Sequence, residues 1–279
     1  MDERIEKNVV TITPPKGWLR INLAELWRYR ELLYIFVWRD IKVRYKQTII
    51  GVAWAILQPL LLMVVFSTFF GGLAKVPSEG VPYPIFVYAG LLFWTYFSTA
   101  LTNASNSLIE NENILKKIYF PRLLLPLSPT VTPIVDFLVA TVVFGGLLLY
   151  YHFTPTVSTL ILLPILLAIS WCSAFGLGAL LASINVRFRD VRYALPFFIQ
   201  TLLFVTPVIY PATIVGERYR WILALNPMTG VIDTARAVIL GSKPIDFGLL
   251  STSAAIAVIL LILGVFLFRR SERIFADVA

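Results

Sequence analysis

Long apolar runs dominate the pattern of hydrophobic and polar positions along the chain. Six of them have the length expected of membrane-spanning segments, at residues 52–73, 85–108, 123–151, 160–184, 194–209 and 247–268. An α-helix rises about 1.5 Å per residue, so about 20 apolar residues cross the roughly 30 Å hydrocarbon core of a bilayer. The pattern therefore predicts an all-α integral membrane protein with six transmembrane helices.

A further apolar stretch, residues 221–240, does not read as a seventh span. It contains Asn226-Pro227 as well as Asp233 and Arg236, and each charge costs roughly 2.5 to 3.5 kcal/mol at the centre of a bilayer. We predict two short re-entrant helices that are broken at Asn226-Pro227 and packed on protein. An amphipathic external segment that lies flat on the membrane is the alternative.

The distribution of positive charge predicts the orientation. All but five of the 24 lysines and arginines fall at the two ends of the chain or in the second and fourth connecting segments, the five being Lys75, Arg218, Arg220, Arg236 and Lys243. Six spans place those basic regions on one side, and the positive-inside rule assigns that side to the cytoplasm. The net charge of +8 then reflects membrane orientation, and we expect no nucleic-acid partner. The first 50 residues lack the apolar core of a signal peptide.

Composition excludes several classes of protein. Hydrophobic residues make up 58% of the 279 residues and charged residues 14%, against roughly 25% charged residues in typical soluble domains. The mean hydropathy is +0.80. One cysteine and one histidine exclude a disulfide scaffold and a Cys- or His-rich metal site, and the common nucleotide-binding and hydrolase motifs are missing. An intramembrane enzyme would have to use His152 with a serine, but this histidine follows Tyr150 and Tyr151 at a predicted helix end and fits an interfacial position. We expect neither a catalytic nor a metal site.

An amphipathic helix precedes the first span. Apolar residues recur at helical spacing, at Leu23, Leu26, Trp27, Leu33, Tyr34 and Val37, with Arg28 and Glu31 on the other face and Arg30 nearby. Asn22 and Glu25 resemble a capping box. Basic residues at Lys42, Arg44 and Lys46 then lead into the membrane. The segment is either a basic anchor on anionic lipid or a collar that docks a cytoplasmic partner.

Two polar features lie within the predicted spans. Thr95, Thr99, Thr102, Asn103 and Asn106 share one helix face that runs toward Glu110, so this face contacts either another helix or a wet conduit. Asp136 is the one charge well inside a span. A structural hydrogen bond or a polar point on a conduit wall is favoured for Asp136, and a proton-coupled carrier is the alternative. Ala174 and Gly178 predict close helix packing.

The segment between the second and third spans, residues 110–122, is polar and then amphipathic. Acidic residues open it and lysines close it, which suits a helix dipole, and Pro121 ends it. A short helix held at the cytoplasmic surface would suit the transmission of force from a partner protein. A solvated connector is the alternative.

Several sequence blocks together resemble the permease subunits of ABC polysaccharide exporters, the Wzm-like family that exports O-antigen, capsule or teichoic acid. The blocks run in family order: WRDIKVRYKQT at 38–48, GVAW at 51–54, QPL at 58–60, KIYFPR at 117–122, NVRFRDVRY at 185–193, TPVIYP at 206–211 and LNPM at 225–228. The resemblance implies a homodimeric permease in the bacterial inner membrane, working with two separate ATP-binding cassette subunits that bind the ATP and Mg. No cofactor is expected in this chain. The expected cargo is a lipid-linked glycan; a related exporter of a drug or lipid is the alternative.

The resemblance also implies roles for individual residues. The whole chain, 1–279, would form a single transmembrane domain, with an interfacial segment at 1–51, a membrane domain at 52–268 and a cytoplasmic tail at 269–279. The interface helix includes Leu26, Trp27, Arg28 and Arg30. The residues expected to couple the permease to the ATPase are Glu110, Glu112, Asn113, Lys116, Lys117, Phe120, Pro121 and Arg122, and Asn226 and Pro227 are expected at the re-entrant break.

The proposed cargo gives the aromatic residues a possible use. Sugars present apolar CH faces that stack on aromatic rings and hydroxyl groups that need hydrogen-bond partners. A sliding polymer needs many weak contacts of both kinds. The candidates for lining the channel are Trp54, Phe66, Phe70, Trp94, Tyr96, Phe97, Phe198 and Tyr210, together with Thr99 and Asn103. Any one of the rings could instead face lipid or the protein core.

Overall fold

The computed structural model describes residues 23–46, 51, 53–115, 117–188 and 190–272, and the regular secondary structure of these residues is entirely helical. The α-helices are α1 (Leu23–Arg28), α2 (Arg30–Lys46), α3 (Ala53–Phe66), α4 (Tyr83–Glu110), α5 (Glu112–Leu115), α6 (Leu124–Val131), α7 (Pro133–Tyr150), α8 (Val157–Arg187), α9 (Val191–Val205), α10 (Arg220–Ala224), α11 (Pro227–Leu240) and α12 (Phe247–Ser271). A π-helix, Ser67–Leu73, continues α3, and two 3₁₀ turns, Ala212–Ile214 and Glu217–Tyr219, precede α10.

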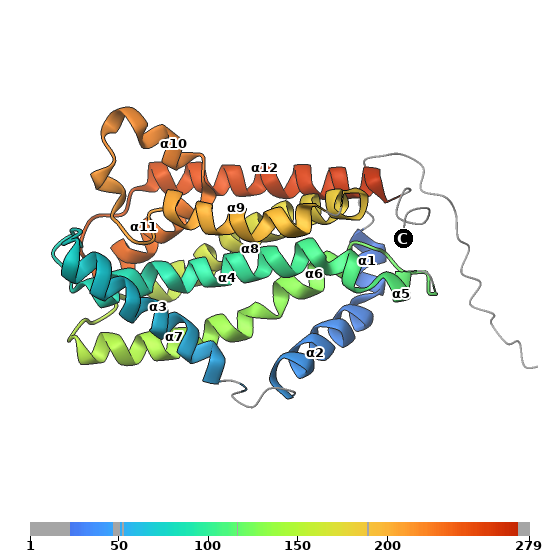
Figure 1. Cartoon of the computed structure of the whole chain (residues 1–279), viewed down its shortest axis with the longest axis horizontal. Helices are drawn as coiled ribbons and strands as arrows, with labels where there is room; N and C mark the ends of the chain where they lie inside the picture. The colour runs from blue at the N-terminus through green and yellow to red at the C-terminus, as the bar shows by residue number, and fades with distance from the viewer. Residues whose placement is uncertain (1–22, 47–50, 52, 116, 189, 273–279) are drawn as a thin grey trace, which may run out of the picture.

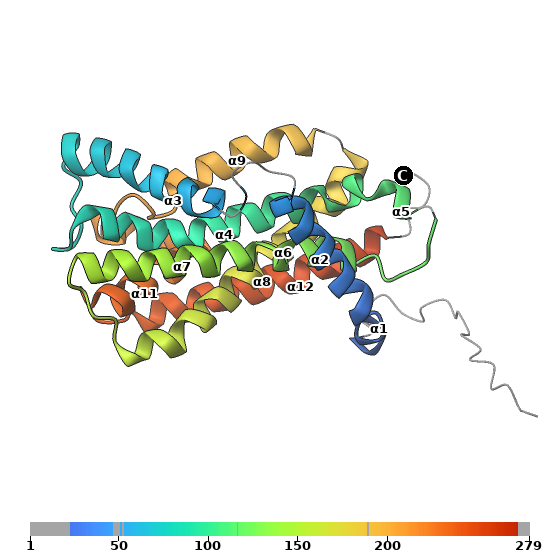
Figure 2. The same cartoon turned by 90° about the horizontal axis from the view of Figure 1, so that it is seen from below.

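Long helices lie side by side along the longest axis of the molecule (Figure 1). Turning the view by 90° shows that α2 is inclined against this bundle at one end (Figure 2). We call this the α5 end, because it carries α1, α5 and the last turn of α12; α10 and α11 mark the opposite α10 end (Figure 1). The bundle therefore has two ends with different kinds of connecting segment.

Five stretches are long and apolar enough to cross a membrane: Ala53–Leu73, Tyr83–Glu110, Leu124–Tyr150, Ser158–Arg187 and Phe247–Ser271. They coincide with five of the six predicted runs. The sixth run, 194–209, forms α9, which has only 15 residues and leaves helical geometry at Thr206, ahead of Pro207. The third run is divided at Thr132, because Pro133 occupies the first turn of α7, where its missing N–H is tolerated.

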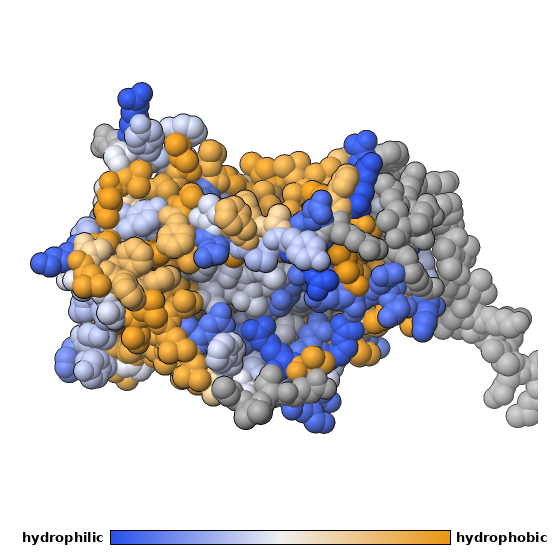
Figure 3. Space-filling view, viewed as in Figure 1, coloured by the Kyte–Doolittle hydropathy of each residue, from blue (hydrophilic) through white to orange (hydrophobic). Residues whose placement is uncertain are grey.

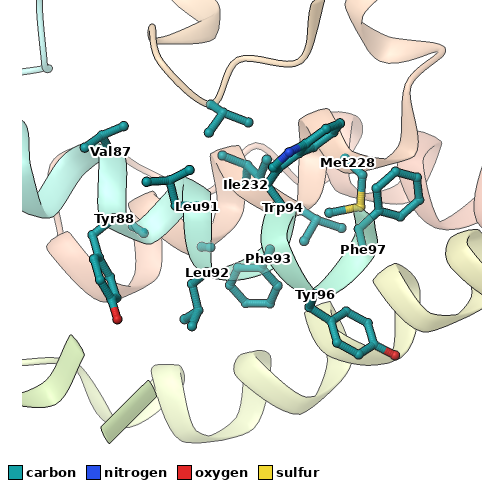
Figure 4. Close-up of a cluster of buried hydrophobic side chains, with 14 of the residues drawn as sticks. Val87, Tyr88, Leu91, Leu92, Phe93, Trp94, Tyr96, Phe97, Met228 and Ile232 are labelled. Carbon is teal, nitrogen blue, oxygen red and sulfur yellow. The ribbon is translucent and has the colours of Figure 1, made fainter. Parts of the chain in front are cut away.

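The core of the protein is built around α4. Within its most apolar stretch 78% of the residues are buried, whereas the other four stretches bury between 17% and 39%. It contacts α3, α6, α7, α8, α9 and α11. Figure 4 shows its side chains from Val87 to Phe97 gathered with Met228 and Ile232 of α11. The other helices therefore pack around α4 at the centre of the bundle. The other four stretches leave wide apolar faces exposed to lipid or to a partner.

Small residues let α8 lie close against its neighbours. A Cβ built on Gly264 of α12 would stand 1.9 Å from the carbonyl oxygen of Gly176, so the two backbones touch. A Cβ on Gly178 would stand 2.6 Å from Ala104 of α4, and Ala174 is fully buried. The close packing predicted from Ala174 and Gly178 is confirmed. Asn185 adds a hydrogen bond from α8 to the Ser105 carbonyl, 3.0 Å long.

The predicted break at Asn226-Pro227 separates α10 from α11. The Asn226 side chain accepts a 3.0 Å hydrogen bond from the Met228 N–H, as an N-cap residue does, while Pro227 fills the first helical position. The Asn226 amide also donates to the Thr206 hydroxyl at 2.6 Å. Every residue of α11 is buried. The predicted packing on protein is therefore observed for α11, and the break is tied to the end of α9. In α10 and just after it, Trp221, Ile222 and Leu225 are exposed, so the predicted packing does not extend to the first of the two short helices.

Arg236 of α11 holds the non-helical segment that follows α9. Its guanidinium donates to the carbonyl oxygens of Pro207, Val208 and Tyr210, and also to that of Phe86 on α4. It lies 3.6 Å from the centre of the Phe86 ring and is only 1% exposed. Gly90 makes room, because a Cβ there would stand 2.8 Å from the guanidinium. One side chain thus supplies the donors that an unwound backbone lacks.

Asp233, the other charge on α11, is also paired. Its carboxylate lies 2.5 Å from the Lys243 ammonium, which lies 2.9 Å from the Glu79 carboxylate. Glu79 belongs to the connection between α3 and α4, and Lys243 to the connection between α11 and α12. This three-residue cluster joins both connections to α11 at the α10 end.

The contact between Gly176 and Gly264 can be tested with a matched pair of alanine substitutions. Gly264→Ala should lower the free energy of unfolding by roughly 1 to 3 kcal/mol, because the new methyl group forces two backbones apart. Gly145→Ala on α7 meets nothing within 4 Å and should be neutral or stabilising by up to about 1 kcal/mol. Thermal unfolding of both variants in detergent measures the difference, and equal shifts would contradict the close contact.

Arg236→Met should be more damaging than the loss of any exposed charge. The substitution leaves several buried carbonyl groups without a donor, each costing about 1 to 3 kcal/mol. Arg218→Met removes the same charge from an exposed position near α10 and should change the melting temperature little. The comparison is again thermal unfolding in detergent. A melting temperature for Arg236→Met that matches the Arg218→Met value would show that the clamp contributes no stability.

Candidate functional site

The connection between α4 and α6 presents an exposed apolar tip at the α5 end. Ile118 is 63% exposed and Tyr119 is 65% exposed, between the exposed Lys117 and the half-buried Arg122. A shallow hollow of about 210 Å³ lies along this tip. Glu110 and Asn113 are exposed beside it and Glu112 is half-buried in α5; Lys116 lies outside the described residues. The predicted short helix exists as the four residues of α5.

The base of the same connection is firmly attached. Phe120 is only 4% exposed and its ring packs edge-to-face on Phe36 of α2, with centroids 5.7 Å apart. Pro121 is buried. Arg122 donates to the carbonyl of Glu272, at the end of α12. Phe120, Pro121 and Arg122 therefore position the tip, and the exposed residues before them are available for contact.

The apolar residues of α1 and α2 divide between two faces, where the sequence predicted one. Leu26, Leu33 and Phe36 pack against the cluster that contains Phe120. Trp27 and Tyr34, predicted on the same face, are 71% and 66% exposed. The backbone hydrogen bonds from Tyr29 to Glu25 and from Leu33 to Tyr29 keep the helical spacing across the junction of α1 and α2. On that spacing Leu26 and Leu33 lie about 100° from Trp27 and Tyr34, so the buried stripe is narrower than the apolar face that the sequence predicted.

The exposed face of α1 and α2 combines aromatic and basic residues. Arg30 stacks on Trp27 at 5.6 Å, and Lys42 lies 5.2 Å from the Trp38 ring. Arg28 is also exposed. Rings of this kind beside positive charges suit the boundary between lipid headgroups and water.

A polar network fixes α2 to the rest of the α5 end. Arg39 donates to Asp40 and, at 3.0 Å, to Asn111, which caps the end of α4. Asp40 accepts a 3.0 Å hydrogen bond from Ser128 of α6. These residues border a hollow of about 420 Å³ between α2, α4 and α6, which we call the α2 cavity.

Asp136, the charge predicted inside a span, is paired with α2. Its carboxylate lies 2.6 Å from the guanidinium of Arg44 and accepts a hydrogen bond from the Tyr45 hydroxyl. Burial, together with this hydrogen bond, raises the pKa of Tyr45, so the hydroxyl stays protonated as a donor. The predicted structural hydrogen bond is present. Its donors precede Asp136 by about 90 residues, so sequence spacing gave no sign of them.

The polar stripe of α4 has more than one environment. Thr95 and Thr99 border a small pocket beside Asp136, lined also by Gln58 of α3. Asn103 and Glu110 border the α2 cavity. Asn106 accepts a 3.2 Å hydrogen bond from Asn185 of α8. Asn106 thus joins two helices, as one interpretation predicted, and Thr102 donates to the Ser98 carbonyl of its own helix. The wet conduit stays a prediction for Thr95, Thr99 and Asn103.

The aromatic channel candidates separate by burial. Trp94, Tyr96 and Phe97 are at most 5% exposed, and Phe66 is 9% exposed; the rings of the first three lie inside the cluster drawn in Figure 4. Trp94, Tyr96 and Phe97 contact other protein side chains and do not reach an open surface, because α4 is enclosed by its neighbours. Phe70 and Tyr210 are half-buried, while Trp54 of α3 and Phe198 of α9 are exposed.

The helices α3 and α9 keep broad surfaces that the other described residues do not cover. Leu195 is the one buried residue of α9, and Tyr193, Phe197 and Phe204 are exposed. Polar residues, Gln200 and Thr201, are exposed on the same helix. Figure 3 shows apolar residues predominating toward the α10 end of this face and polar residues around α2.

Some residues of this site escaped sequence reasoning. Ile118 and Tyr119 were not singled out, although two apolar residues inside a charged connecting segment are a signal for a contact surface. The sequence indicates only a basic charge for Arg44 and no individual role for Arg39, because the contacts that join them to α7 and to the end of α4 reach across about 90 and 72 residues.

Comparison with known proteins agrees with the architecture. Residues 31–240 match the family described as ABC-2 type transporter. The chain is 32% identical to the O-antigen export system permease protein RfbA of Myxococcus xanthus, over 91% of this chain and 98% of that protein. It is 28% identical to a Klebsiella pneumoniae protein of the same name, over 93% and 98% of the two chains. A similarity of 20% extends to the polysialic acid transport protein KpsM of Escherichia coli, over 84% and 91%.

The family match covers both the polar network around α2 and the clamped segment at α11, and the relatives align with nearly their whole length. The described helices and their exposed apolar faces are those of a multi-pass membrane protein. The chain therefore belongs to the ABC-2 type transporter family.

Proposed function

We propose that this protein is the membrane subunit of an ATP-driven exporter that moves a lipid-linked polysaccharide across the bacterial inner membrane. The cargo would be an O-antigen-like glycan, a capsule glycan or a teichoic acid. Two copies of the chain would form the conduit, and two separate ATP-binding cassette subunits would hydrolyse ATP. The observation that carries the proposal is the similarity over 91% of the chain to a permease named for O-antigen export.

The connection between α4 and α6 supports the coupling role. An apolar tip on an anchored base can transmit a push, because the tip binds a partner while the base moves with the helices it holds. The base is attached to α2 through Phe36 and to α12 through Glu272. We assign Lys117, Ile118 and Tyr119, with Glu110, Glu112, Asn113 and Lys116, to the contact with the ATP-binding subunit.

The proposed topology has six spans with both chain ends in the cytoplasm. The α5 end would face the cytoplasm, and α9, extended by the residues up to 209, would be the fifth span. The break at Asn226-Pro227 and the burial of α11 support a re-entrant pair, because backbone that leaves helical geometry at membrane depth needs protein around it. The clamp by Arg236 meets that need.

The proposed conduit uses the open faces of α3 and α9. Trp54, Phe198 and neighbouring exposed rings offer stacking surfaces for sugars, and Gln200 and Thr201 offer hydrogen bonds. Polar side chains on a lipid-facing surface are unfavourable, so these two residues favour a wet conduit or a second copy of the chain beside α9. Trp94, Tyr96 and Phe97 are buried and are therefore left out of this wall.

The competing functions receive less support. Asp136 is already neutralised by Arg44, which leaves a proton-coupled carrier without its expected free carboxylate. His152 is exposed at a positive φ of 60° after α7, where it forms part of a turn. Among the described residues no group of three His, Cys, Asp or Glu side chains could hold a metal.

The central test is export by the complex reconstituted with its ATP-binding subunit in liposomes. Lipid-linked polysaccharide should cross the bilayer with ATP and not with a non-hydrolysable analogue. A complex whose ATP-binding subunit cannot hydrolyse ATP is the control. ATP-driven movement of a small drug or a simple lipid, without movement of glycan, would favour the alternative exporter.

Tyr119→Asp should weaken binding of the ATP-binding subunit. An aromatic contact residue of this type is worth about 2 kcal/mol, or roughly 30-fold in affinity. Tyr219→Asp makes the same change at a position of similar exposure near α10 and should leave the affinity unchanged. Binding of the purified subunit to each variant measures the effect. Equal affinities for the two variants would remove this tip from the interface.

A further inference from the structure

Arg44 borders both hollow spaces that lie along the polar stripe of α4. On one side is the α2 cavity, which Asn103 and Glu110 of α4 also line. On the other is the small pocket lined by Thr95, Thr99 and Asp136. The guanidinium of Arg44, held 2.6 Å from Asp136, therefore stands between two parts of one polar face.

We propose that Arg44, Tyr45 and Asp136 form a latch that closes the C-terminal turn of α2 over a polar crevice along α4, and that this latch opens in each export cycle. Asp136 is then a positioning residue: it holds α2 in place and does not carry protons. The assignment to the export cycle rests on the proposed function. The closed latch itself is a property of the protomer.

The chemistry of the three residues suits a closure that is strong and reversible. The Asp136 side chain is 14% exposed and the Arg44 side chain 32% exposed, so the ion pair is shielded on the Asp136 side and open to water on the Arg44 side. If α2 moves away, Arg44 becomes hydrated while the carboxylate stays at the wall of α7 and needs water from the opened crevice. Opening is therefore unfavourable without a driving force, and Thr95 and Thr99 become wet when it happens.

The structure also contains a connection that can supply this force. Arg39 lies on α2 and donates to Asn111, the residue at which α4 ends and the proposed coupling segment begins. Displacement of that segment by an ATP-binding subunit would pull on α2 through Arg39. The α2 cavity, about 420 Å³ in volume, leaves room between α2 and the bundle for such a displacement.

The latch is testable through the wetting of Thr99. A Thr99→Cys reporter, placed in a Cys172→Ser background, is treated with a membrane-impermeant thiol reagent in the purified complex without ATP. Asp136→Asn and Arg44→Gln should each raise the labelling rate about tenfold, the shift expected when a minor open state gains population. Lys42→Gln removes an equal charge from an exposed position on the same helix and should leave the rate unchanged. Equal labelling in all four proteins would overturn the latch.

Exchanging the charges of Arg44 and Asp136 distinguishes loss of the latch from loss of folding. Arg44→Asp alone places two carboxylates together and should reduce ATP-driven export strongly, and Asp136→Arg alone should do the same with two guanidinium groups. The double variant should recover most of the export and the low labelling rate. Failure of the double variant to recover either quantity would contradict a role based on mutual attraction.

The labelling experiment needs neither cargo nor hydrolysis, so its outcome is independent of the proposed cargo. A wild-type complex that moves no glycan but shows the expected labelling pattern would contradict the proposed function and leave the closed latch standing. A complex that exports glycan, yet whose Thr99→Cys labelling does not increase during ATP turnover, would overturn the opening of the latch during export.

Discussion

A backbone polar group surrounded by lipid or apolar protein must find its hydrogen-bond partner within the protein, and the rest of this structure depends on that constraint. Helices meet it by themselves, which is why the described regular structure is helical throughout. The segment after α9 does not, because Pro207 and Pro211 prevent a regular helix there. Arg236 supplies the missing donors, and its placement explains both the burial of α11 and the glycine at position 90.

The same principle explains why polar residues in the membrane domain occur as connected groups. Asp233 is paired with Lys243, Asp136 with Arg44, and Asn226 with Thr206. Arg44 and Asp136 join elements about 90 residues apart, whereas Asp233 and Lys243 are ten residues apart and reach a distant part of the chain through Glu79. The polar contacts thus join particular elements, while the cluster of buried side chains around α4 is mainly apolar.

The sequence predicted those parts of the structure that depend on local pattern. Five of the six apolar runs coincide with long helices, the break at Asn226-Pro227 lies where its residue types place it, and Gly178 packs closely as expected. The misplaced features depend on tertiary contacts. Trp27 and Leu26 are adjacent in α1 but face different environments, because neighbouring residues of a helix point about 100° apart and only the Leu26 side meets protein. From the sequence, Trp94 is a candidate for stacking on a sugar, but in the folded protein α11 covers its ring. Neither the partners of Asp136 nor those of Arg236 could be found from spacing, because the chain folds back over 26 to 150 residues to form these contacts.

The burial of α4 has a consequence for the biosynthesis of the protein. Membrane proteins are inserted from the amino terminus as they are made, and α4 precedes α6, α7, α8 and α11, most of the helices that enclose it. It is also the least apolar of the five long spans. When α4 is inserted, Asn106 lacks its hydrogen-bond partner, because Asn185 of α8 has not yet been synthesised. Before its neighbours are made, α4 is therefore the inserted segment with the weakest apolar stabilisation. Its packing is complete only when α11 has been translated.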